Sequence, residues 1–441
     1  MPRMVVAKKH EPNRLTQRAK RYAKVSTSFV KVGAHASVHS SLDPVFLRSI
    51  LGNLKGPLMK AAQFLATIPD LLPPPLAHEL VQLQTQAPPM DWKLVQKRMR
   101  AALGPDWLSH FQTFEKTPRF SASLGQVHKA VTKDGQTIAC KLQYPEMESL
   151  VEADLQQLKL LLSLFQTFDR AAGDLSGPWQ EIAARFREEL DYMREAKNIN
   201  LYAKMLEDMP DVHTPTPLPT LSTAQLLSMR WLEGVNIMEH KKDFLQSKRN
   251  AIATSLFRIW YKPLFHYGIL HADPHPGNYT VREEGAINLF DFGCVRIFEA
   301  KLINTMITLY HALLREDESQ AYEAFTAWGF ENLSKEHFKI LLQWARFIHA
   351  PFLKDKTGKL HETSTAEKGK ALALQIHRDL RQHGGLKIPP SFVFIDRASL
   401  SLGAAFLHLD AQANWHQLFQ ELIEGFTQKS VAARQKKLLT A

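Results

Sequence analysis

The sequence predicts a mostly helical α+β protein built from two lobes. Two short β-leaning segments, 126–131 and 136–143, flank the hairpin signal Lys133-Asp134-Gly135. Long helical patterns follow at 149–170 and 178–207, and the chain is again mainly helical from 244 onward. A small strand-rich unit between helical blocks indicates one lobe that carries a sheet and a second lobe made of helices.

The composition is that of an ordinary globular protein, with 45% hydrophobic and 22% charged residues in a chain of 441. Two cysteines, Cys140 and Cys294, make neither a disulfide framework nor the paired spacing of a zinc site. We therefore expect a reducing, cytoplasmic compartment. No secretory-signal pattern is present, and the longest apolar runs are shorter than the roughly 20 residues that span a bilayer.

The charge is concentrated towards the ends of the chain. The formal net charge is +11, and residues 1–31 hold nine Lys or Arg against one acid, Glu11. We interpret this segment as a solvated chain end, with peripheral contact with an anionic membrane and organelle import as the alternatives. We expect no nucleic-acid partner.

We divide the chain into four parts. Residues 1–42 form the basic tail, and 43–115 form a helical extension in which apolar residues recur at steps of three and four until prolines interrupt the pattern. Residues 116–235 form the lobe with the strands and a helical insertion. Residues 236–441 form the helical lobe.

The strongest chemical signal is the run His271-Ala272-Asp273-Pro274-His275-Pro276-Gly277-Asn278, followed by Asp291-Phe292-Gly293. Phosphoryl transfer needs an acid near the attacking oxygen, and it needs carboxylate and amide oxygens that hold magnesium on the phosphates. The catalytic loop of kinases spaces its Asp and Asn five positions apart, as Asp273 and Asn278 are here. Both elements in this order predict a protein-kinase-like bilobal fold with a helical N-terminal extension.

A metal cluster is the alternative interpretation of the same run. His271, Asp273 and His275 have ligand chemistry for zinc or iron, but their spacing in a loop lacks the i, i+4 geometry of helical ligand pairs. We prefer the phosphoryl-transfer interpretation, with His271 as a structural brace of the loop.

A lysine on a strand is the second chemical signal. Ile138-Ala139-Cys140-Lys141 is similar to the strand whose lysine pairs with nucleotide phosphates and with a helix glutamate. One hairpin earlier, the loop around Ser123 keeps Gly125 and Val127 of a glycine-rich flap. The two earlier glycine positions hold Phe120 and Ala122, so we expect this flap to hold nucleotide differently.

These motifs together resemble the UbiB (AarF-like) atypical kinase family over about residues 45–410. The matching stretches are Lys60-Ala61-Ala62-Gln63, Pro69-Asp70-Leu71-Leu72-Pro73, Gly125-Gln126-Val127-His128, Lys141-Leu142-Gln143-Tyr144-Pro145, Glu189-Leu190-Asp191-Tyr192-Met193-Arg194-Glu195-Ala196, Glu233-Gly234, the run from His271 to Asn278, and Asp291-Phe292-Gly293. The run from His271 and the stretch from Glu189 are each highly specific for that family.

The resemblance implies roles at the nucleotide site. Lys141 would contact the phosphates of ATP or ADP and pair with Glu195. Asn278 and Asp291 would hold Mg²⁺, and Asp273 would occupy the position of the catalytic aspartate. The flap residues implied to line the nucleotide are Ala122, Ser123, Gly125 and Val127.

The resemblance also implies a cover for the pocket. Lys60 and Gln63 would belong to a helical extension that folds over the place where a protein kinase accepts its peptide, and Glu189 and Asp191 would meet that extension near the nucleotide. The family usually has glycine where this chain has Ala62. An added methyl group and a helix propensity higher by roughly 1 kcal/mol would shift the extension slightly.

Family members bind adenine nucleotides and support ubiquinone or other isoprenoid-lipid metabolism. The resemblance therefore implies an ATPase or small-molecule kinase, with an isoprenoid lipid or quinone precursor as a partner. A nucleotide-gated lipid-binding or scaffold protein and a protein kinase are the alternatives. The protein kinase is disfavoured, because a helical pattern begins near Glu299 and almost no chain is left after Gly293 for a peptide platform.

Overall fold

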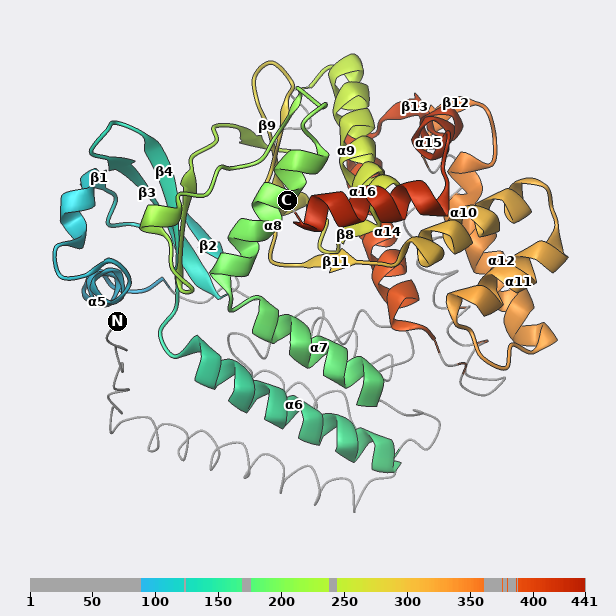
Figure 1. Cartoon of the computed structure of the whole chain (residues 1–441), viewed down its shortest axis with the longest axis horizontal. Coiled ribbons are helices and arrows are strands. Elements are labelled where there is room, and N and C mark those ends of the chain that lie inside the picture. Colours follow the sequence, from blue (N-terminus) through green and yellow to red (C-terminus); the bar gives the residue numbers. More distant parts are fainter. Residues whose placement is uncertain are drawn as a thin grey trace.

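The computed structural model describes residues 89–122, 124–168, 176–237, 244–360 and 388–440, together with positions 375, 379 and 386. The helical extension that carries Lys60, Ala62 and Gln63 lies outside the described residues, as does the basic tail. Within the described part the protein has a strand-rich lobe and a helical lobe, with α8 and α16 beside the junction (Figure 1). The predicted bilobal α+β fold is confirmed.

The strand-rich lobe begins with α5 (Trp92–Leu103), the 3₁₀ turn η1 (Trp107–His110) and β1 (Phe111–Phe114). Its sheet has the order β1-β3-β4-β6, and β2 pairs with β3 at one end. The bounds of these strands are β2 Phe120–Ala122, β3 Gly125–Thr132, β4 Thr137–Gln143 and β6 Leu226–Arg230. The expectation of helices throughout 43–115 fails at β1, because its four residues pair antiparallel with β3 and complete the sheet.

Two helices are inserted between β4 and the helix that carries Glu195. α6 (Met147–Phe168) and α7 (Ser176–Glu188) lie side by side along one edge of the molecule (Figure 1). The single helix expected at 178–207 is divided, because α7 ends and α8 (Tyr192–Met205) starts afresh. Asp191 causes this restart, since its carboxylate accepts hydrogen bonds from the backbone N–H groups of Met193 and Arg194 as an N-cap.

Short strands join the two lobes. β5 (Val212–His213), β10 (Ile287–Leu289), β9 (Tyr279–Val281) and β7 (Val235–Asn236) form one small sheet in that order. β8 (Ile269–His271) pairs antiparallel with β11 (Val295–Ile297). The pairing brings together the two ends of the segment that contains Asp273, Asn278 and Asp291. The 3₁₀ turns η3 (Pro219–Leu221) and η5 (Pro276–Asn278) complete the connections.

The helical lobe is arranged around α9 (Gln246–Tyr267). The other elements are α10 (Ala300–Leu314), α11 (Glu318–Trp328), α12 (Lys335–His349), η6 (Ala350–Phe352), β12 (Thr357–Lys359), α14 (Pro390–Leu409), β13 (Gln412–Asn414), α15 (Trp415–Ile423) and α16 (Gln428–Thr440). The basic C-terminal segment forms α16, which packs on α9, α10 and α8. Gln435 anchors α16 by donating to the carbonyl oxygens of Tyr267 and Phe298, each at 2.8 Å.

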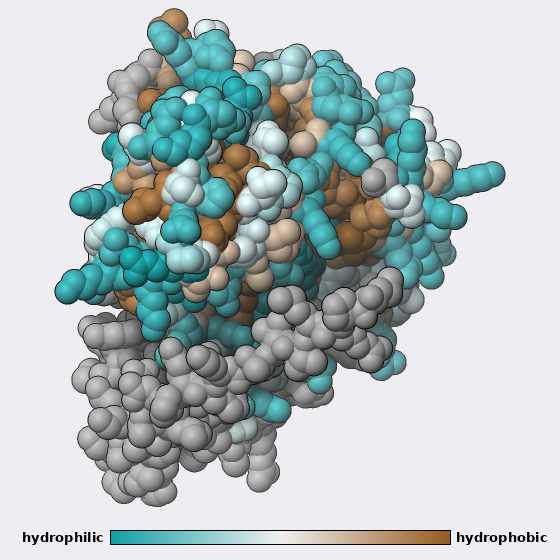
Figure 2. All heavy atoms as spheres, turned by 60° about the vertical axis from the view of Figure 1, so that its left-hand side comes forward, coloured by the Kyte–Doolittle hydropathy of each residue, from teal (hydrophilic) through white to brown (hydrophobic). Residues whose placement is uncertain are grey.

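The largest hydrophobic core is continuous between the lobes. It runs from β4 and β6 through buried side chains of α8, among them Ile199 and Tyr202, into the helical lobe. A second core fills the outer half of the sheet lobe around Trp107 and Leu142. Figure 2, which turns the left-hand side of Figure 1 forward, shows a mostly hydrophilic surface with scattered hydrophobic residues. Among the described residues, no helix is long and apolar enough to cross a membrane.

Candidate nucleotide site

Lys141 lies in the middle of the sheet, and its side chain meets two carboxylates. On β4 it stands between Val127 of β3 and Leu227 of β6. Its ammonium nitrogen donates to both carboxylate oxygens of Glu195, at 2.7 and 2.8 Å. Asp291 Oδ1 lies 3.7 Å from the same nitrogen. The structure thus brings together three of the residues that the sequence assigned to one site.

The electrostatics of this cluster keep the lysine charged. Burial acts to lower the pKa of Lys141, but the carboxylates of Asp291 and Glu195 outweigh it and raise that pKa above its ordinary value. Burial raises the pKa of Glu195 and Asp291 adds to the rise, while Lys141 opposes it. Two carboxylates face one ammonium, so the cluster carries an excess negative charge that a bound cation would neutralise.

Helix α8 positions Glu195 along with other side chains on the same face. Tyr192 lies one turn earlier, and the Lys141 nitrogen is 5.2 Å from the centre of its ring. The Tyr192 hydroxyl is buried and has no hydrogen-bond partner in the described part of the chain. Burial raises the pKa of this phenol, so it remains protonated and available as a donor.

Gly125 at the start of β3 allows a close approach of backbone and ring. An added Cβ would lie 2.3 Å from the carbonyl oxygen of Leu142 and 2.9 Å from the Tyr192 hydroxyl. Only glycine fits this position without a backbone shift. Its role here is therefore steric. Ser123 lies outside the described residues, and Ala122 ends β2.

The loop after β8 brings Asp273 and Asn278 to the same region. The side-chain amide of Asn278 donates to the carbonyl oxygen of Asp273 at 3.0 Å, which fixes the two residues relative to each other. The backbone carbonyl of Asn278 accepts from the N–H of Phe290 at 2.9 Å, next to Asp291. The amide group is planar, so this bond also fixes the direction of the Asn278 amide oxygen, which is the atom of that side chain able to bind a metal.

Backbone contacts hold Asp291 in place, and its side-chain Oδ1 accepts from the N–H of Gly293 at 3.3 Å. His271 donates from Nε2 to the carbonyl oxygen of Asp291 at 2.7 Å, because a carbonyl can only accept. Asn198 of α8 donates to the carbonyl oxygen of Phe292 at 2.8 Å. Asp291 itself has a φ of +56°, in the left-handed region that non-glycine residues rarely occupy. Such conformations persist where the surroundings hold them, as they do here.

The two histidines of the run have structural contacts, as the interpretation of His271 as a brace predicts. His271 is buried and braces Asp291, and burial lowers its pKa so that it stays neutral. His275 accepts from the N–H of Gly277 at 3.1 Å and caps η5. Among the described residues, no group of three or more His, Cys, Asp or Glu side chains has the geometry of a metal site. His271 and His275 thus each have a structural contact within the loop.

The segment from Trp231 to Gly234 connects β6 to β7, and we call it the hinge. Sequence reasoning gave its anchoring residues no role. Asn288, fully buried on β10, donates to the carbonyl oxygen of Glu233 and to the hydroxyl of Thr280, both at 2.9 Å. Gly234 permits this contact, since an added Cβ would lie 2.7 Å from Thr280 Oγ1 and 2.9 Å from Asn288 Nδ2. A buried amide in a strand that is otherwise apolar was the available signal for this anchor.

The flap touches the hinge through an aromatic stack. Phe120 of β2, although 60% exposed, stacks on Trp231 with ring centres 6.1 Å apart. Lys129 lies over the same indole at 4.6 Å and pairs with Glu233 at 2.9 Å. A phenylalanine at the first glycine position of the flap therefore ties the flap to the hinge, which a glycine could not do.

The two acidic residues before α8 have separate positions. Asp191 is the N-cap described above. Glu189 lies beside the loop of Asp291, since an added Cβ on Gly293 would be 3.8 Å from its Cγ. Glu188, immediately before Glu189, pairs with Arg194 at 2.5 Å and Arg296 at 2.6 Å. Their expected contact with the extension of Lys60 and Gln63 falls on residues that the structure does not describe, so it stays a prediction.

Comparison with known proteins matches this geometry to a family. The model of the ABC1 atypical kinase-like domain matches residues 82–325, more than half of the chain. The chain belongs to this family. A chicken AarF domain-containing protein kinase 1 is 30% identical over 282 residues, which cover 62% of this chain and 53% of the relative. The Arabidopsis thaliana protein ACTIVITY OF BC1 COMPLEX KINASE 7, chloroplastic, is 28% identical over 282 residues, covering 63% and 40%.

One solved structure shows the same fold. The Mycobacterium tuberculosis protein Rv3197, solved in complex with erythromycin, aligns with a TM-score of 0.62 at 24% identity, covering 92% of this chain and 99% of that one. The chain spans about half the length of the curated relatives that it matches. The resemblance to the UbiB and AarF-like family is thus confirmed for an ABC1 atypical kinase-like domain.

Proposed function

We propose that this chain is a UbiB-type ATP-dependent atypical kinase or ATPase that binds an adenine nucleotide with Mg²⁺. One observation carries the proposal: the ammonium of Lys141 lies 2.7 Å from Glu195 and 3.7 Å from Asp291, which are far apart in sequence. A buried ion pair of this kind beside a half-exposed carboxylate is the arrangement that orients a lysine towards phosphate oxygens.

The donor set fits magnesium. Asp291 would supply a carboxylate oxygen, and Asn278 would supply its amide oxygen, which are the hard ligands that Mg²⁺ prefers. The excess negative charge of the Lys141 cluster favours a divalent cation at this place. When bound, the ion would neutralise charge on the phosphates. The protein's own groups orient the nucleotide through Lys141, and Asp273 would accept a proton from an attacking oxygen.

A small molecule or water is the acceptor that this fold favours. β11 is followed directly by α10, whose N-cap is Glu299, so the chain after Gly293 offers no extended platform for a peptide. We therefore propose ATP hydrolysis or phosphorylation of a small molecule in ubiquinone or other isoprenoid-lipid metabolism. We further propose that the protein works in the cytoplasm, in peripheral contact with an anionic membrane. The alternative is import into an organelle, such as the chloroplast in the name of the Arabidopsis relative.

Phosphate release from the purified chain tests the enzymatic part. We expect magnesium-dependent release that Asp291→Asn reduces at least tenfold, while Asp106→Asn, which removes an exposed carboxylate without a capping bond, leaves it unchanged. Equal release from the wild type and Asp291→Asn would refute an ATPase at this site. Nucleotide binding without turnover would instead point to a nucleotide-gated lipid-binding or scaffold protein. Quinone content in a strain that lacks the chain tests the lipid part.

A further inference from the structure

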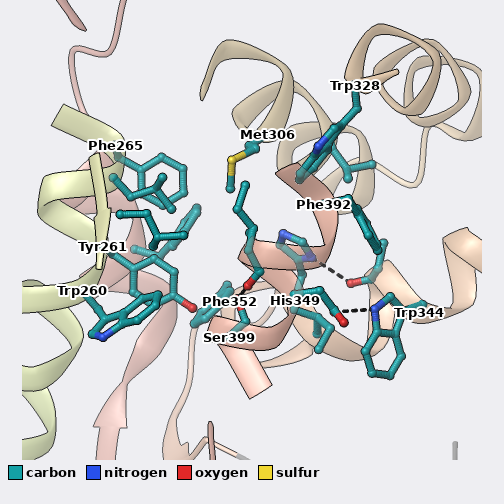
Figure 3. A pocket seen from close by; sticks show the side chains of 18 residues that line it. Trp260, Tyr261, Phe265, Met306, Trp328, Trp344, His349, Phe352, Phe392 and Ser399 are labelled. Atoms are coloured by element: carbon teal, nitrogen blue, oxygen red, sulfur yellow. Dashed lines mark hydrogen bonds between the residues drawn. The ribbon is translucent and has the colours of Figure 1, made fainter. Parts of the chain in front are cut away.

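A cavity lies inside the helical lobe, and its lining residues do not include those of the Lys141 cluster. It has a volume of about 60 Å³ and lies between α9, α10, α12, α14 and neighbouring elements (Figure 3). On the measure in which one water needs about 15 Å³, it has room for roughly four non-hydrogen atoms. Leu270 of β8 forms part of its wall, one residue before His271.

The walls of this cavity are mainly aromatic. Figure 3 shows indole and phenyl rings from several helices arranged around the space. They include Trp260, Phe265, Trp328, Trp344, Phe392 and Phe419. Aromatic faces carry partial negative charge and attract cations, and rings that surround a small space are the arrangement that recognises ammonium groups.

The polar hydrogens of the cavity wall already have acceptors inside the protein. The indole N–H groups of Trp260, Trp328 and Trp344 donate to Tyr279, Ser391 and Asp396, at 3.0, 3.1 and 2.7 Å. The cavity wall therefore offers no indole donor to a ligand.

The hydroxyl and imidazole hydrogens are used as well. Ser399 gives its proton to the carbonyl oxygen of Ile395 at 2.8 Å, so Tyr261, which is hydrogen-bonded to Ser399, must be the donor of that pair. His349 donates from Nδ1 to the carbonyl oxygen of Ala345 at 2.8 Å. This fixes the neutral tautomer, and burial lowers the pKa of the ring. Its Nε2 is then an acceptor.

What the wall offers to a ligand is therefore acceptors, and one of them is an acid. Asp396 uses one carboxylate oxygen for Trp344, and it forms no ion pair with Lys, Arg or His among the described residues. An ionised carboxylate in apolar surroundings is costly unless a cation accompanies it. Burial accordingly raises the pKa of Asp396 to about 7. A positively charged occupant would supply the missing partner.

We propose that this cavity binds a small organic cation, an alkylammonium group of about four non-hydrogen atoms, through Asp396 and the surrounding aromatic rings. The ammonium contacts the carboxylate, donates to His349 Nε2 where it carries a hydrogen, and packs its carbons against the rings. Because a ligand of this size binds at best with a Kd of tens of micromolar, the interaction is expected at millimolar concentrations. The proposal is independent of the nucleotide site.

Thermal unfolding of the full chain with trimethylammonium chloride tests this site. At 100 mM we expect Tm to rise by about 2–3 °C relative to sodium chloride of equal ionic strength. The same concentration of tert-butanol, a neutral molecule of similar shape, should give no such rise. Asp396→Asn should abolish the effect, and Glu323→Gln, which removes an exposed acid of α11, should retain it.

A local readout separates binding from general stabilisation. The indole N–H of Trp344 donates to Asp396, so its NMR resonance, assigned with Trp344→Phe, should move on titration with trimethylammonium in the wild type. Ala345→Leu, which fills the cavity from α12, should block the shift even where Asp396→Asn folds poorly. No rise in Tm and no resonance shift, an equal rise with tert-butanol, or an equal response of Asp396→Asn would each overturn the proposal.

Discussion

Removing the charge of Glu195 is the sharpest test of the cluster formed by Lys141, Glu195 and Asp291. The Glu195→Gln side chain keeps its volume in a position that is 4% exposed, but it loses the charge and one of the two acceptors for Lys141. Asp291 remains 3.7 Å from the ammonium, with its side chain 40% exposed. The perturbation therefore leaves a buried lysine with only a partly solvated partner.

The magnitude follows from these two partners. Breaking a buried ion pair by removing one side costs about 3–5 kcal/mol when nothing compensates. Coulomb attraction falls as the inverse of distance. At equal screening, Asp291 at 3.7 Å therefore attracts the ammonium roughly 70% as strongly as Glu195 at 2.7 Å does. The true fraction is smaller because water reaches Asp291. We expect Glu195→Gln to lower the free energy of unfolding by about 2–3 kcal/mol. Affinity for Mg-ATP should fall about tenfold, because Lys141 loses its fixed orientation.

Urea unfolding and calorimetric titration with Mg-ATP measure the two effects. The matched control is Glu233→Gln, which breaks a Lys–Glu pair at 2.9 Å whose acid is 78% exposed. An exposed pair contributes about 0–1 kcal/mol, so this variant should unfold nearly as the wild type does. A loss below 1 kcal/mol for Glu195→Gln, or a loss equal to that of the control, would contradict the burial argument. Unchanged nucleotide affinity would contradict the role given to Lys141.

Three further predictions concern single side chains. Tyr192→Phe removes a buried hydroxyl without a described partner, so the free energy of unfolding in urea should be equal or higher. Affinity for Mg-ATP should fall severalfold, because the hydroxyl is expected to donate to a phosphate. Unchanged affinity would rule out that contact. Asp191→Ala should lower the free energy of unfolding by about 1 kcal/mol, because α8 loses its N-cap. Asp191→Ser should recover most of that free energy. Loss of activity in a variant that keeps full stability would point to a role of Asp191 beyond capping. Asp396, with a pKa of about 7 when folded and 3.8 as its ordinary value, binds more protons when folded, so it destabilises the fold progressively as pH rises from about 4 to 7, by up to about 4 kcal/mol. Asp396→Asn should remove that slope in unfolding curves at pH 5 and 7, and identical slopes in both proteins would refute the assignment.

Local sequence was sufficient to predict strands β3 and β4 and the position of Lys141 on β4, although β1 was expected to be helical. The turn at Lys133-Asp134-Gly135 fixed the register of β3 and β4, and with it the place of Lys141 opposite Val127. The catalytic-loop spacing likewise predicted that Asp273 and Asn278 lie together, and the bond between them is formed within one short loop. Short-range patterns suffice where turn chemistry or loop length determines the geometry.

The parts that were not predicted depend on contacts between distant segments. The break before α8 was missed because Asp191 reads as one more polar residue in a helical pattern until its capping bonds are seen. The anchoring of the hinge by Asn288 depends on a pairing of strands that sequence does not reveal. Tyr192 and Asn198 were within reach, because they lie three positions before and after Glu195 and share its helix face.

The conformation of Asp291 links stability to function at the centre of the site. Its backbone lies in a left-handed region that costs a non-glycine residue of the order of 1–3 kcal/mol, and His271 and Asn198 hold it there by binding two successive carbonyl oxygens. Asparagine tolerates this region better than most residues, so Asp291→Asn removes the charge with little change in backbone preference. Loss of activity in that variant would therefore report on the carboxylate itself. An Asp291→Ala variant would mix the lost carboxylate with a backbone that no longer favours the turn.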